Sequence, residues 1–385
     1  MGYKDIVLSI MKIIRLAIVR QKYRPDGGAE RFIYRALEAL DNSGIELNII
    51  TREWSGVARA NWHVHLCNPQ KWGRISRERG FAHAVKRYWQ CEHFDLVQSH
   101  ERIVGCDIFR AGDGVHQVWL EQRARILPPP QRCLIKLSRY HRYVLSTESE
   151  LFHSPLLKKI ICNSAMVRRD IMRCYGVGKD KIALIYNSID LQHFFPADSE
   201  QRRAARVALS IPQQACALIY IGSGFERKGL RQAISAVAAT DRYLIVMGHD
   251  KYLCYYQALA QSMGCLSRLR FIGVRKDVLP CYHAVDALIL PSLYDPFPNV
   301  ILEAMSCGLP VITSQCCGGA EFIEQGKQGF VCDALDIASL REFVAAIPLR
   351  EHNPAMSFAA RSRVSGCTPA NLSCQLTGLY QQLLS

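Results

Sequence analysis

The chain has 385 residues, of which 49% are hydrophobic and 21% charged, and it carries a formal net charge of +14. This length exceeds what one hydrophobic core usually supports, so two domains are expected, and the composition excludes a largely disordered protein. The positive charge favours an anionic partner, which leaves nucleic acid, an acidic membrane surface and a phosphorylated substrate as candidates.

The cysteines, the histidine spacing and the apolar runs indicate which class of protein this is. The 16 cysteines are scattered through apolar runs without a C-x-x-C pair, which is typical of reduced core residues in a cytosolic protein. No spacing predicts a metal site, because His63 and His65 are expected to share one exposed strand face. Residues 1–10 are interpreted as an extension outside the fold. Lys12 and Arg15 break the first apolar run, so no secretory signal is predicted, and no run is long enough to span a membrane.

The first half of the chain alternates predicted strands with predicted helices. This alternation favours a parallel sheet covered by helices on both faces. Strands are expected at residues 13–19, 46–51, 62–67, 94–99, 107–111, 159–162 and 181–186, and helices at residues 29–42, 76–90 and 164–175.

Two glycine-containing turns in this half are candidate ligand sites. Gly27 and Gly28 follow the first strand, where glycine lets the backbone approach a ligand at a helix N-terminus, although a tight turn explains them equally well. Asp113 stands between two glycines after the fifth strand and is predicted to point into a cleft, as is His116. Turn formation or helix capping is the alternative for both.

Residues 117–145 mix basic and aromatic side chains with a single acid, Glu121. This mixture suits an anionic membrane interface, where cations meet headgroups and aromatic rings lie at the boundary. Single-stranded nucleic acid is a second candidate ligand, and a solvated helix pair is the third interpretation. The basic residues are Arg123, Arg125, Arg132, Lys136, Arg139 and Arg142.

Residues 187–196 are expected to form a hinge between two domains. The first domain is predicted over residues 11–190 and the second over residues 191–365. Residues 366–385 form a tail that ends in an amphipathic helix and could pack back across the first domain. The second domain repeats the α/β pattern, with strands expected at residues 216–221, 243–247, 269–273 and 287–290.

Two loops at the carboxyl ends of these strands are candidate nucleotide sites. The loop Gly222–Gly229 places Arg227 and Lys228 among glycines, including Gly224, so that both cations and the backbone could hold a diphosphate. A solvated basic pair is the alternative. The loop that begins at Val274 could bind a nucleotide base through its backbone.

Residues 286–314 are predicted to form a strand, a loop, a helix and a second strand. Pro298 suits the start of the helix, and Gly308 with Pro310 ends it. The loop and helix carry the carboxylates of Asp295 and Glu303. Ionised carboxylates only accept hydrogen bonds, so beside an anion-binding helix start they suit the hydroxyls of a sugar or ribose. The alternative is a solvated loop acid and a first-turn Glu that interacts with the helix dipole.

Three motifs together resemble the retaining GT-B glycosyltransferases of family four. They are G-G-A-E-R from Gly27, G-S-G-F-E-R-K-G from Gly222, and D-P-F-P-N-V-I-L-E-A-M-S-C-G-L-P-V-I-T from Asp295. The resemblance covers nearly the whole chain. Within the family, the G-x-D-x-x-x-A-x-D run ending at Asp113 and the L-S-R-Y-H-R-Y run near Tyr140 resemble enzymes of lipopolysaccharide core synthesis.

The resemblance implies an α/β protein of the GT-B fold, with two Rossmann-like domains that face a cleft and no metal requirement. It implies that Arg227 and Lys228 neutralise the donor diphosphate, that Glu303 binds ribose hydroxyls, and that Asp295 contacts the donor sugar. Asp113 would lie near the reacting carbon, and Gly27 with Gly28 would line the cleft.

The implied activity is transfer of a hexose, with retention, from a nucleotide sugar to a lipopolysaccharide core acceptor. The donor base would be uridine, and the enzyme would work on the cytoplasmic face of the inner membrane without a cofactor or nucleic acid.

Two departures from the family pattern leave a second function open. The chain has Asp295 where the family usually has Glu, and Pro298 where it often has Gly, which removes an N–H donor while Asn299 and Val300 still offer theirs. A non-catalytic nucleotide-sugar or glycan-binding protein on the same fold is therefore the alternative. A nicotinamide oxidoreductase is disfavoured because the G-x-G-x-x-G spacing is incomplete.

Overall fold

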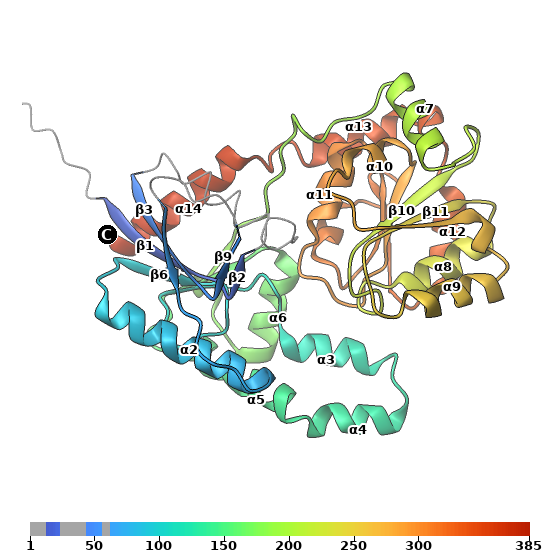
Figure 1. Cartoon of the computed structure of the whole chain (residues 1–385). Coiled ribbons are helices and arrows are strands. Elements are labelled where there is room, and N and C mark those ends of the chain that lie inside the picture. Colours follow the sequence, from blue (N-terminus) through green and yellow to red (C-terminus); the bar gives the residue numbers. More distant parts are fainter. Residues whose placement is uncertain (1–12, 24–43, 56–61) are drawn as a thin grey trace, which may run out of the picture. The chain divides into compact units, whose positions relative to one another are not determined.

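The fold consists of two large parallel β-sheets with their helices, and a two-stranded parallel sheet of β2 (Lys22–Tyr23) and β4 (Glu53–Trp54) (Figure 1). A computed structural model describes residues 13–23, 44–55 and 62–385. The chain divides into two compact units: residues 1–110, 149–160 and 373–385 form the first, and residues 111–148 and 161–372 the second. Three predicted features lie outside the described residues: the extension at residues 1–10, the helix at residues 29–42, and the turn at Gly27 and Gly28. The predicted domain boundary at residue 190 stays a prediction.

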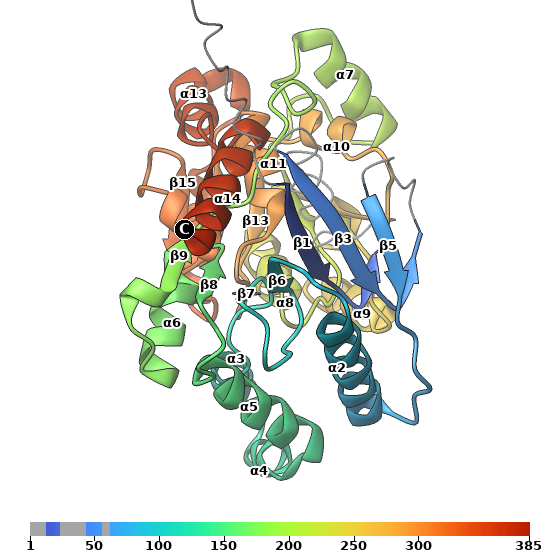
Figure 2. The same ribbon diagram turned by 90° about the vertical axis from the view of Figure 1, so that its left-hand side faces the viewer.

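The first sheet has seven strands in the order β5-β3-β1-β6-β7-β8-β9. The pairs β1 with β3, β1 with β6, β3 with β5 and β6 with β7 are all parallel (Figure 2). Helix α2 packs through Phe81, Val85 and Trp89, which recur every four residues and so lie on one face. The strands are β1 (Ile14–Val19), β3 (Ile45–Thr51), β5 (Trp62–Leu66), β6 (Leu96–Ser99), β7 (Ile108–Arg110), β8 (Lys159–Cys162) and β9 (Ile182–Leu184). The helices of this half are α2 (Arg74–Cys91), α3 (His116–Ala124), α4 (Pro129–Leu137), α5 (Arg139–Phe152) and α6 (Ala165–Tyr175).

The second sheet has six strands in the order β12-β11-β10-β13-β14-β15, and all its pairs are parallel. Its central strands are buried on both faces, which is why the sequence shows short continuous apolar runs there. The strands are β10 (Ala217–Ile221), β11 (Tyr243–Met247), β12 (Leu269–Gly273), β13 (Ala287–Leu290), β14 (Val311–Ser314) and β15 (Gly329–Cys332). The helices are α7 (Ser199–Ala208), α8 (Leu230–Ala238), α9 (Leu253–Ser262), α10 (Leu279–His283), α11 (Asn299–Ser306), α12 (Ile337–Ala346), α13 (Pro354–Arg363) and α14 (Pro369–Leu384).

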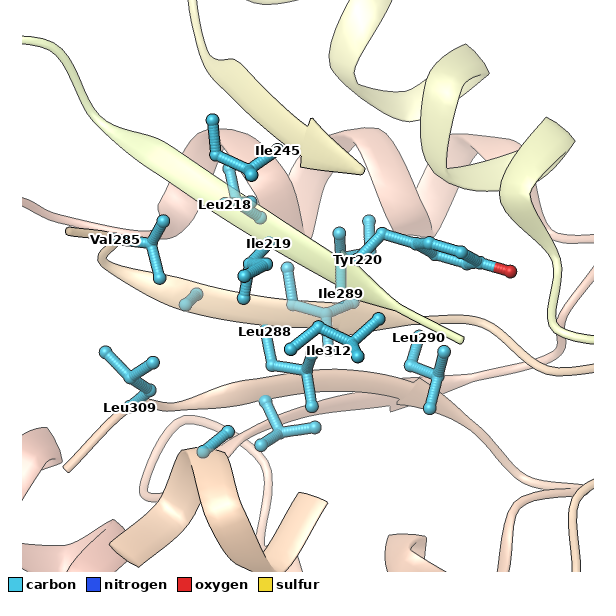
Figure 3. Close-up of a cluster of buried hydrophobic side chains, with 14 of the residues drawn as sticks. Leu218, Ile219, Tyr220, Ile245, Val285, Leu288, Ile289, Leu290, Leu309 and Ile312 are labelled. Carbon is cyan, nitrogen blue, oxygen red and sulfur yellow. The ribbon is translucent and has the colours of Figure 1, made fainter. Parts of the chain in front are cut away.

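The core of this second sheet gathers around β10, β13 and β14. Figure 3 shows side chains of Leu218, Ile219 and Tyr220 beside those of Leu288 and Ile312. All five are fully buried. The predicted strands match the observed ones closely, because a buried parallel strand can be recognised from its apolar run alone. Strand β15 and the helices α7, α8, α9, α10, α12 and α13 were not predicted.

A buried ion cluster fastens α7 to the start of β13. Asp286 precedes this strand and accepts a bond of 2.6 Å from Nη2 of Arg202, while Nη1 of Arg206 lies 3.6 Å from its other oxygen. The same carboxylate accepts the backbone N–H groups of Ala217 and Arg350, each at 2.9 Å. The two arginines are four residues apart on α7 and therefore share one face. The carboxylate is fully buried and bonded on both oxygens, so its loss would leave uncompensated charges in the core.

The tail of the chain belongs to the first unit. Residues 373–385, which include most of α14, group with the first sheet. The hydroxyl of Tyr380 donates to the side-chain oxygen of Gln98 on β6 at 2.9 Å, and Tyr380 is fully buried.

We expect Asp286→Ala to lower the free energy of unfolding by about 3–5 kcal/mol, because two buried arginines lose their counter-ion. Urea unfolding of the full chain, followed by circular dichroism, measures the change. Asp241→Ala is the matched control, because Asp241 is 88% exposed and pairs with Arg242 at the surface, so a change of at most about 0.5 kcal/mol is expected. Equal effects of the two substitutions would contradict the role given to Asp286.

Candidate active site

The candidate site lies at the point where the strand order of the second sheet reverses. From β10 the chain proceeds outward to β11 and β12, then returns to the other side of β10 to form β13. The loops after β10 and β13 therefore emerge side by side at the carboxyl edge of the sheet. Ligands of open α/β sheets bind at such a switch point.

Two cations of the β10 loop converge there on one carboxylate of the β13 loop. Nζ of Lys228 lies 3.1 Å, and Nη1 of Arg227 3.2 Å, from the same oxygen of Asp295. The side chain of Asp295 is 8% exposed, that of Lys228 13% and that of Arg227 37%. Burial raises the pKa of Asp295, but the charges of Lys228 and then Arg227 lower it by more, so the net pKa falls below the ordinary value. Residues predicted from separate motifs are thus in direct contact.

Glycines shape the β10 loop around these cations. A Cβ atom on Gly222 would lie 2.9 Å from Cε of Lys228, so the absence of a side chain lets the lysine lie across the end of β10. Gly229, at the start of α8, has a φ of 76°, and a Cβ there would lie 2.7 Å from the carbonyl carbon of Pro291. Gly224 has a φ of 75° with open space beside it, so its backbone is accessible to a ligand.

Glu303 lies in the second turn of α11 and is 2% exposed. The hydroxyl of Tyr282 donates to its carboxylate at 2.8 Å. The alternative given above, a first-turn Glu that interacts with the helix dipole, is therefore wrong for Glu303. The matching alternative for Asp295, a solvated loop acid, is also wrong, because that side chain is 8% exposed.

The start of α11 is fixed by a side-chain bond from outside the helix. Pro298 is the N-cap rather than the first helical residue. Nδ2 of Asn187 donates to the side-chain oxygen of Asn299 at 2.7 Å. The backbone N–H groups of Asn299 and Val300 precede the first intrahelical hydrogen bond, so the helix geometry directs them away from the helix body.

Asp113 is exposed in a turn that packs against the β13 loop. The turn is closed by a bond from the N–H of Gly114 to the carbonyl of Ala111 at 3.2 Å. Gly114 has a φ of 70°, and a Cβ there would lie 2.5 Å from the hydroxyl oxygen of Tyr294 and 2.8 Å from Cγ of Pro296. The structure therefore brings Asp113 beside the loop of Asp295, across a sequence separation that no motif spans.

The remaining predicted site residues are not brought into this contact network. Val274 follows β12, at the edge of the sheet, and is 68% exposed. Gly27 and Gly28 lie outside the described residues. In the described part of the chain, no group of three His, Cys, Asp or Glu side chains is arranged to hold a metal. His65 contacts Asn48 and Tyr88, at 2.9 and 2.8 Å.

Sequence reasoning missed Tyr294 and Asp170. The hydroxyl of Tyr294 accepts the N–H of Val115 at 2.9 Å and donates to Asp170 on α6 at 3.2 Å. Burial raises the pKa of Asp170 to about 6, against the lowering effects of the Tyr294 bond and of Arg173. The only sequence signal was a tyrosine adjacent to a predicted site acid, and it does not specify either partner.

Comparison with known proteins identifies the family to which the chain belongs. The family model described as Glycosyltransferase Family 4 matches residues 26–193, and the model described as Glycosyl transferases group 1 matches residues 201–362. The chain belongs to the group 1 and family 4 glycosyltransferases. The glycosyltransferase family predicted from the three motifs is thus confirmed, and the retaining mechanism stays a prediction.

Individual relatives agree with this glycosyltransferase family over most of the chain. The lipopolysaccharide glucosyltransferase WaaG of Escherichia coli (strain K12) is 24% identical over 82% of this chain and 84% of its own. The lipopolysaccharide core biosynthesis glycosyltransferase LpsE of Rhizobium meliloti (strain 1021) is 27% identical over 84% of this chain and 85% of its own.

Solved structures of glycosyltransferases share the fold. The crystal structure of WaaG has a TM-score of 0.81 at 23% identity and covers 95% of this chain and 99% of its own. Anabaena HepE, crystallised in complex with UDP-glucose, has a TM-score of 0.72 at 16% identity, covering 96% of this chain and all of HepE. The predicted fold class, GT-B with two parallel-sheet domains, is confirmed.

We expect the ionisation of Asp170 to reduce the stability of this glycosyltransferase as the pH rises. A raised pKa means that the folded state holds the proton more tightly, so the stabilisation is present below about pH 4 and is lost as the pH rises through about 6. Asp170→Asn removes this titration. Between pH 4 and pH 7 the difference in unfolding free energy should therefore shift in favour of the variant, by up to about 3 kcal/mol.

Urea unfolding of both proteins at several pH values in that range tests the expectation. A difference between variant and unmodified protein that stays constant with pH would contradict it.

Proposed function

We propose that this glycosyltransferase moves a hexose from a nucleoside diphosphate sugar, with uridine as the base, to a lipopolysaccharide core or related cell-envelope glycan. The convergence of Arg227 and Lys228 on Asp295 at the switch point carries the proposal. An arginine fork and a lysine point charge suit a diphosphate, and without a donor Asp295 neutralises both. The relatives support the proposed acceptor and donor classes: WaaG and LpsE are named for lipopolysaccharide, and HepE was crystallised in complex with UDP-glucose.

The cations would act on the departing diphosphate. As the bond between the anomeric carbon and the diphosphate oxygen breaks, negative charge grows on that oxygen, and Arg227 and Lys228 stabilise it. These two cations supply the charge that a metal ion would otherwise provide, so the proposed reaction requires no metal. Asn299 and Val300 at the start of α11 add N–H donors for the phosphates.

Carboxylates would hold the donor hydroxyls. Glu303 is buried and fixed by Tyr282, so it presents a defined acceptor to the ribose. Asp295 would contact the hexose once the phosphates engage its two cations. Val274, with Gly27 and Gly28, keeps its proposed place in binding the nucleotide and lining the cleft.

Retention would follow from attack on the face that the diphosphate leaves. The acceptor oxygen forms a bond to the anomeric carbon as the diphosphate departs, and the acceptor proton passes to the leaving phosphate oxygen. No enzyme nucleophile is required. Asp113, exposed beside the Asp295 loop, is proposed to lie near the reacting carbon and stabilise its developing positive charge.

The predicted membrane contact is best assigned to α4. Of the basic residues between 117 and 145, Arg125 makes a two-bond ion pair with Asp333 at 2.9 Å, and Arg123 lies 3.5 Å from Glu226. Helix α4, in contrast, has no buried residue, and Leu134 and Leu137 are 65% and 68% exposed. None of the helices described is long and apolar enough to cross a bilayer. We therefore propose peripheral attachment through α4 to the cytoplasmic face of the inner membrane.

Lys228→Ala should reduce turnover about 10²- to 10³-fold while the protein stays folded, because one of two diphosphate counter-charges is lost. Release of UDP from UDP-sugars in the presence of core oligosaccharide measures the rate. Lys327→Ala is the matched control, since Lys327 is 68% exposed and pairs only with Glu324 in the described structure, and its turnover should be unchanged.

Activity of Lys228→Ala equal to that of the unmodified enzyme would refute the diphosphate role. Donor binding by the unmodified protein without transfer to any acceptor would instead favour the non-catalytic alternative.

Asp295 reaches both cations despite its shorter side chain, so the departure from Glu does not remove the charge cluster.

The double substitution Leu134→Asp and Leu137→Asp should weaken binding to phosphatidylglycerol vesicles at least about tenfold. It replaces two exposed apolar side chains of α4 with negative charges, which the anionic headgroups repel. Vesicle co-sedimentation measures binding. Phe358→Asp is the control, because Phe358 on α13 is 76% exposed outside α4. Equal loss in both variants would contradict a specific role of α4. Binding of the unmodified protein to nucleic acid at moderate salt would support the alternative nucleic-acid interpretation.

A further inference from the structure

Tyr294 joins three parts of the candidate site that come from distant positions in the sequence. It lies between Leu293 and Asp295 in the β13 loop and is 2% exposed. Its carbonyl oxygen accepts a bond from Nη1 of Arg227 at 2.9 Å. Its hydroxyl contacts Val115 and Asp170, as described above. One residue thus touches the cation pair through its backbone and the Asp113 turn through its side chain.

The aromatic ring also fills the space left by Gly114. A Cβ on that glycine would lie 2.8 Å from Cε1 of Tyr294, so ring and turn are in close contact. Tyr294 therefore holds the turn at two points. Its ring contacts Gly114, and its hydroxyl accepts the N–H of Val115. Since Asp113 directly precedes Gly114, the position of the aspartate depends on this contact.

The first two N–H groups at the start of α3 are each held by a side chain from elsewhere. The N–H of Val115 donates to Tyr294, and that of His116 donates to both carboxylate oxygens of Glu148, at 2.9 and 3.0 Å. Tyr175 also donates to Glu148, at 2.7 Å. Helix starts usually bind their own N-cap side chain, but Val115 has none that can accept. Of the two external bonds, only that of Tyr294 comes from the loop that carries Asp295.

We propose that Tyr294 is a positioning residue for glycosyl transfer: its hydroxyl, oriented by donation to Asp170, holds the Asp113 turn at a fixed separation from Asp295 and Arg227. The inference rests on the proposed function, because it assigns those three residues to one reaction. A phenol suits the task, since its rigid body leaves two torsions to fix and its oxygen can accept and donate at once.

The effect should appear in turnover rather than in donor binding. Tyr294 makes its side-chain bonds to protein groups, whereas the donor is expected to contact Arg227, Lys228 and Glu303. A misplacement of about 1 Å at the reacting groups can cost about 10²-fold in rate. Loss of the hydroxyl should therefore lower kcat and leave the donor KM nearly unchanged.

The test compares Tyr294→Phe with Tyr220→Phe in the full-length enzyme. Tyr220 on β10 is also buried, and its hydroxyl has no hydrogen-bond partner within the described structure, so its loss should change neither constant. For Tyr294→Phe we expect kcat to fall about tenfold to a hundredfold with the KM for UDP-sugar within about twofold. Hydrogen exchange of the peptide covering residues 113–118 should accelerate in Tyr294→Phe alone.

A second pair of variants decides the matter if Tyr294→Phe fails to fold. Asp170→Ala should lower kcat because the hydroxyl loses its acceptor, and Asp170→Asn, which retains one, should restore it. Unchanged kcat and exchange in Tyr294→Phe, or equal losses in Asp170→Ala and Asp170→Asn, would overturn the inference. Absence of transfer by the unmodified enzyme with every donor would refute the proposed function instead, while the exchange measurement would still test the contact.

Discussion

The site depends on one buried carboxylate held between two cations. Removing Asp295 from water is unfavourable, and the attraction of Lys228 and Arg227 more than offsets that cost. Because the two cations belong to the loop after β10 and the acid to the loop after β13, the ion pairs join the strands on either side of the switch point. Positive charge is thereby concentrated where an open sheet binds its ligand.

A second acid of the same kind stands at the other end of β13. Asp286, before the strand, is paired with two arginines of α7, and Asp295, after it, with the two cations of the β10 loop. Between them the strand is wholly apolar and buried. The apolar run places β13 in the core, and the flanking charges favour one register, since a shift would bury either acid without its partners.

The contacts of residues 111–148 distinguish two parts of this basic, aromatic stretch. Its early cations are engaged with acids of the second unit, as in the ion pair of Arg125 with Asp333, while α4 leaves its leucines exposed. The turn before α3 is held by Tyr294 and Glu148. Both ends of this segment therefore support the candidate site, and the proposed membrane contact lies in α4 between them.

The sequence by itself determined the α/β class and most strands, and it predicted the charged residues of the candidate site, because buried parallel strands and glycine-rich loops are encoded locally. It also predicted the family from three motifs. Only the tertiary structure decided that Lys228, Arg227 and Asp295 form one cluster, that Glu303 is buried against Tyr282, and that Tyr294 meets Val115. These contacts join residues up to 179 positions apart. Side-chain pairing at such separations depends on strand order and loop packing, which no local pattern of residues specifies.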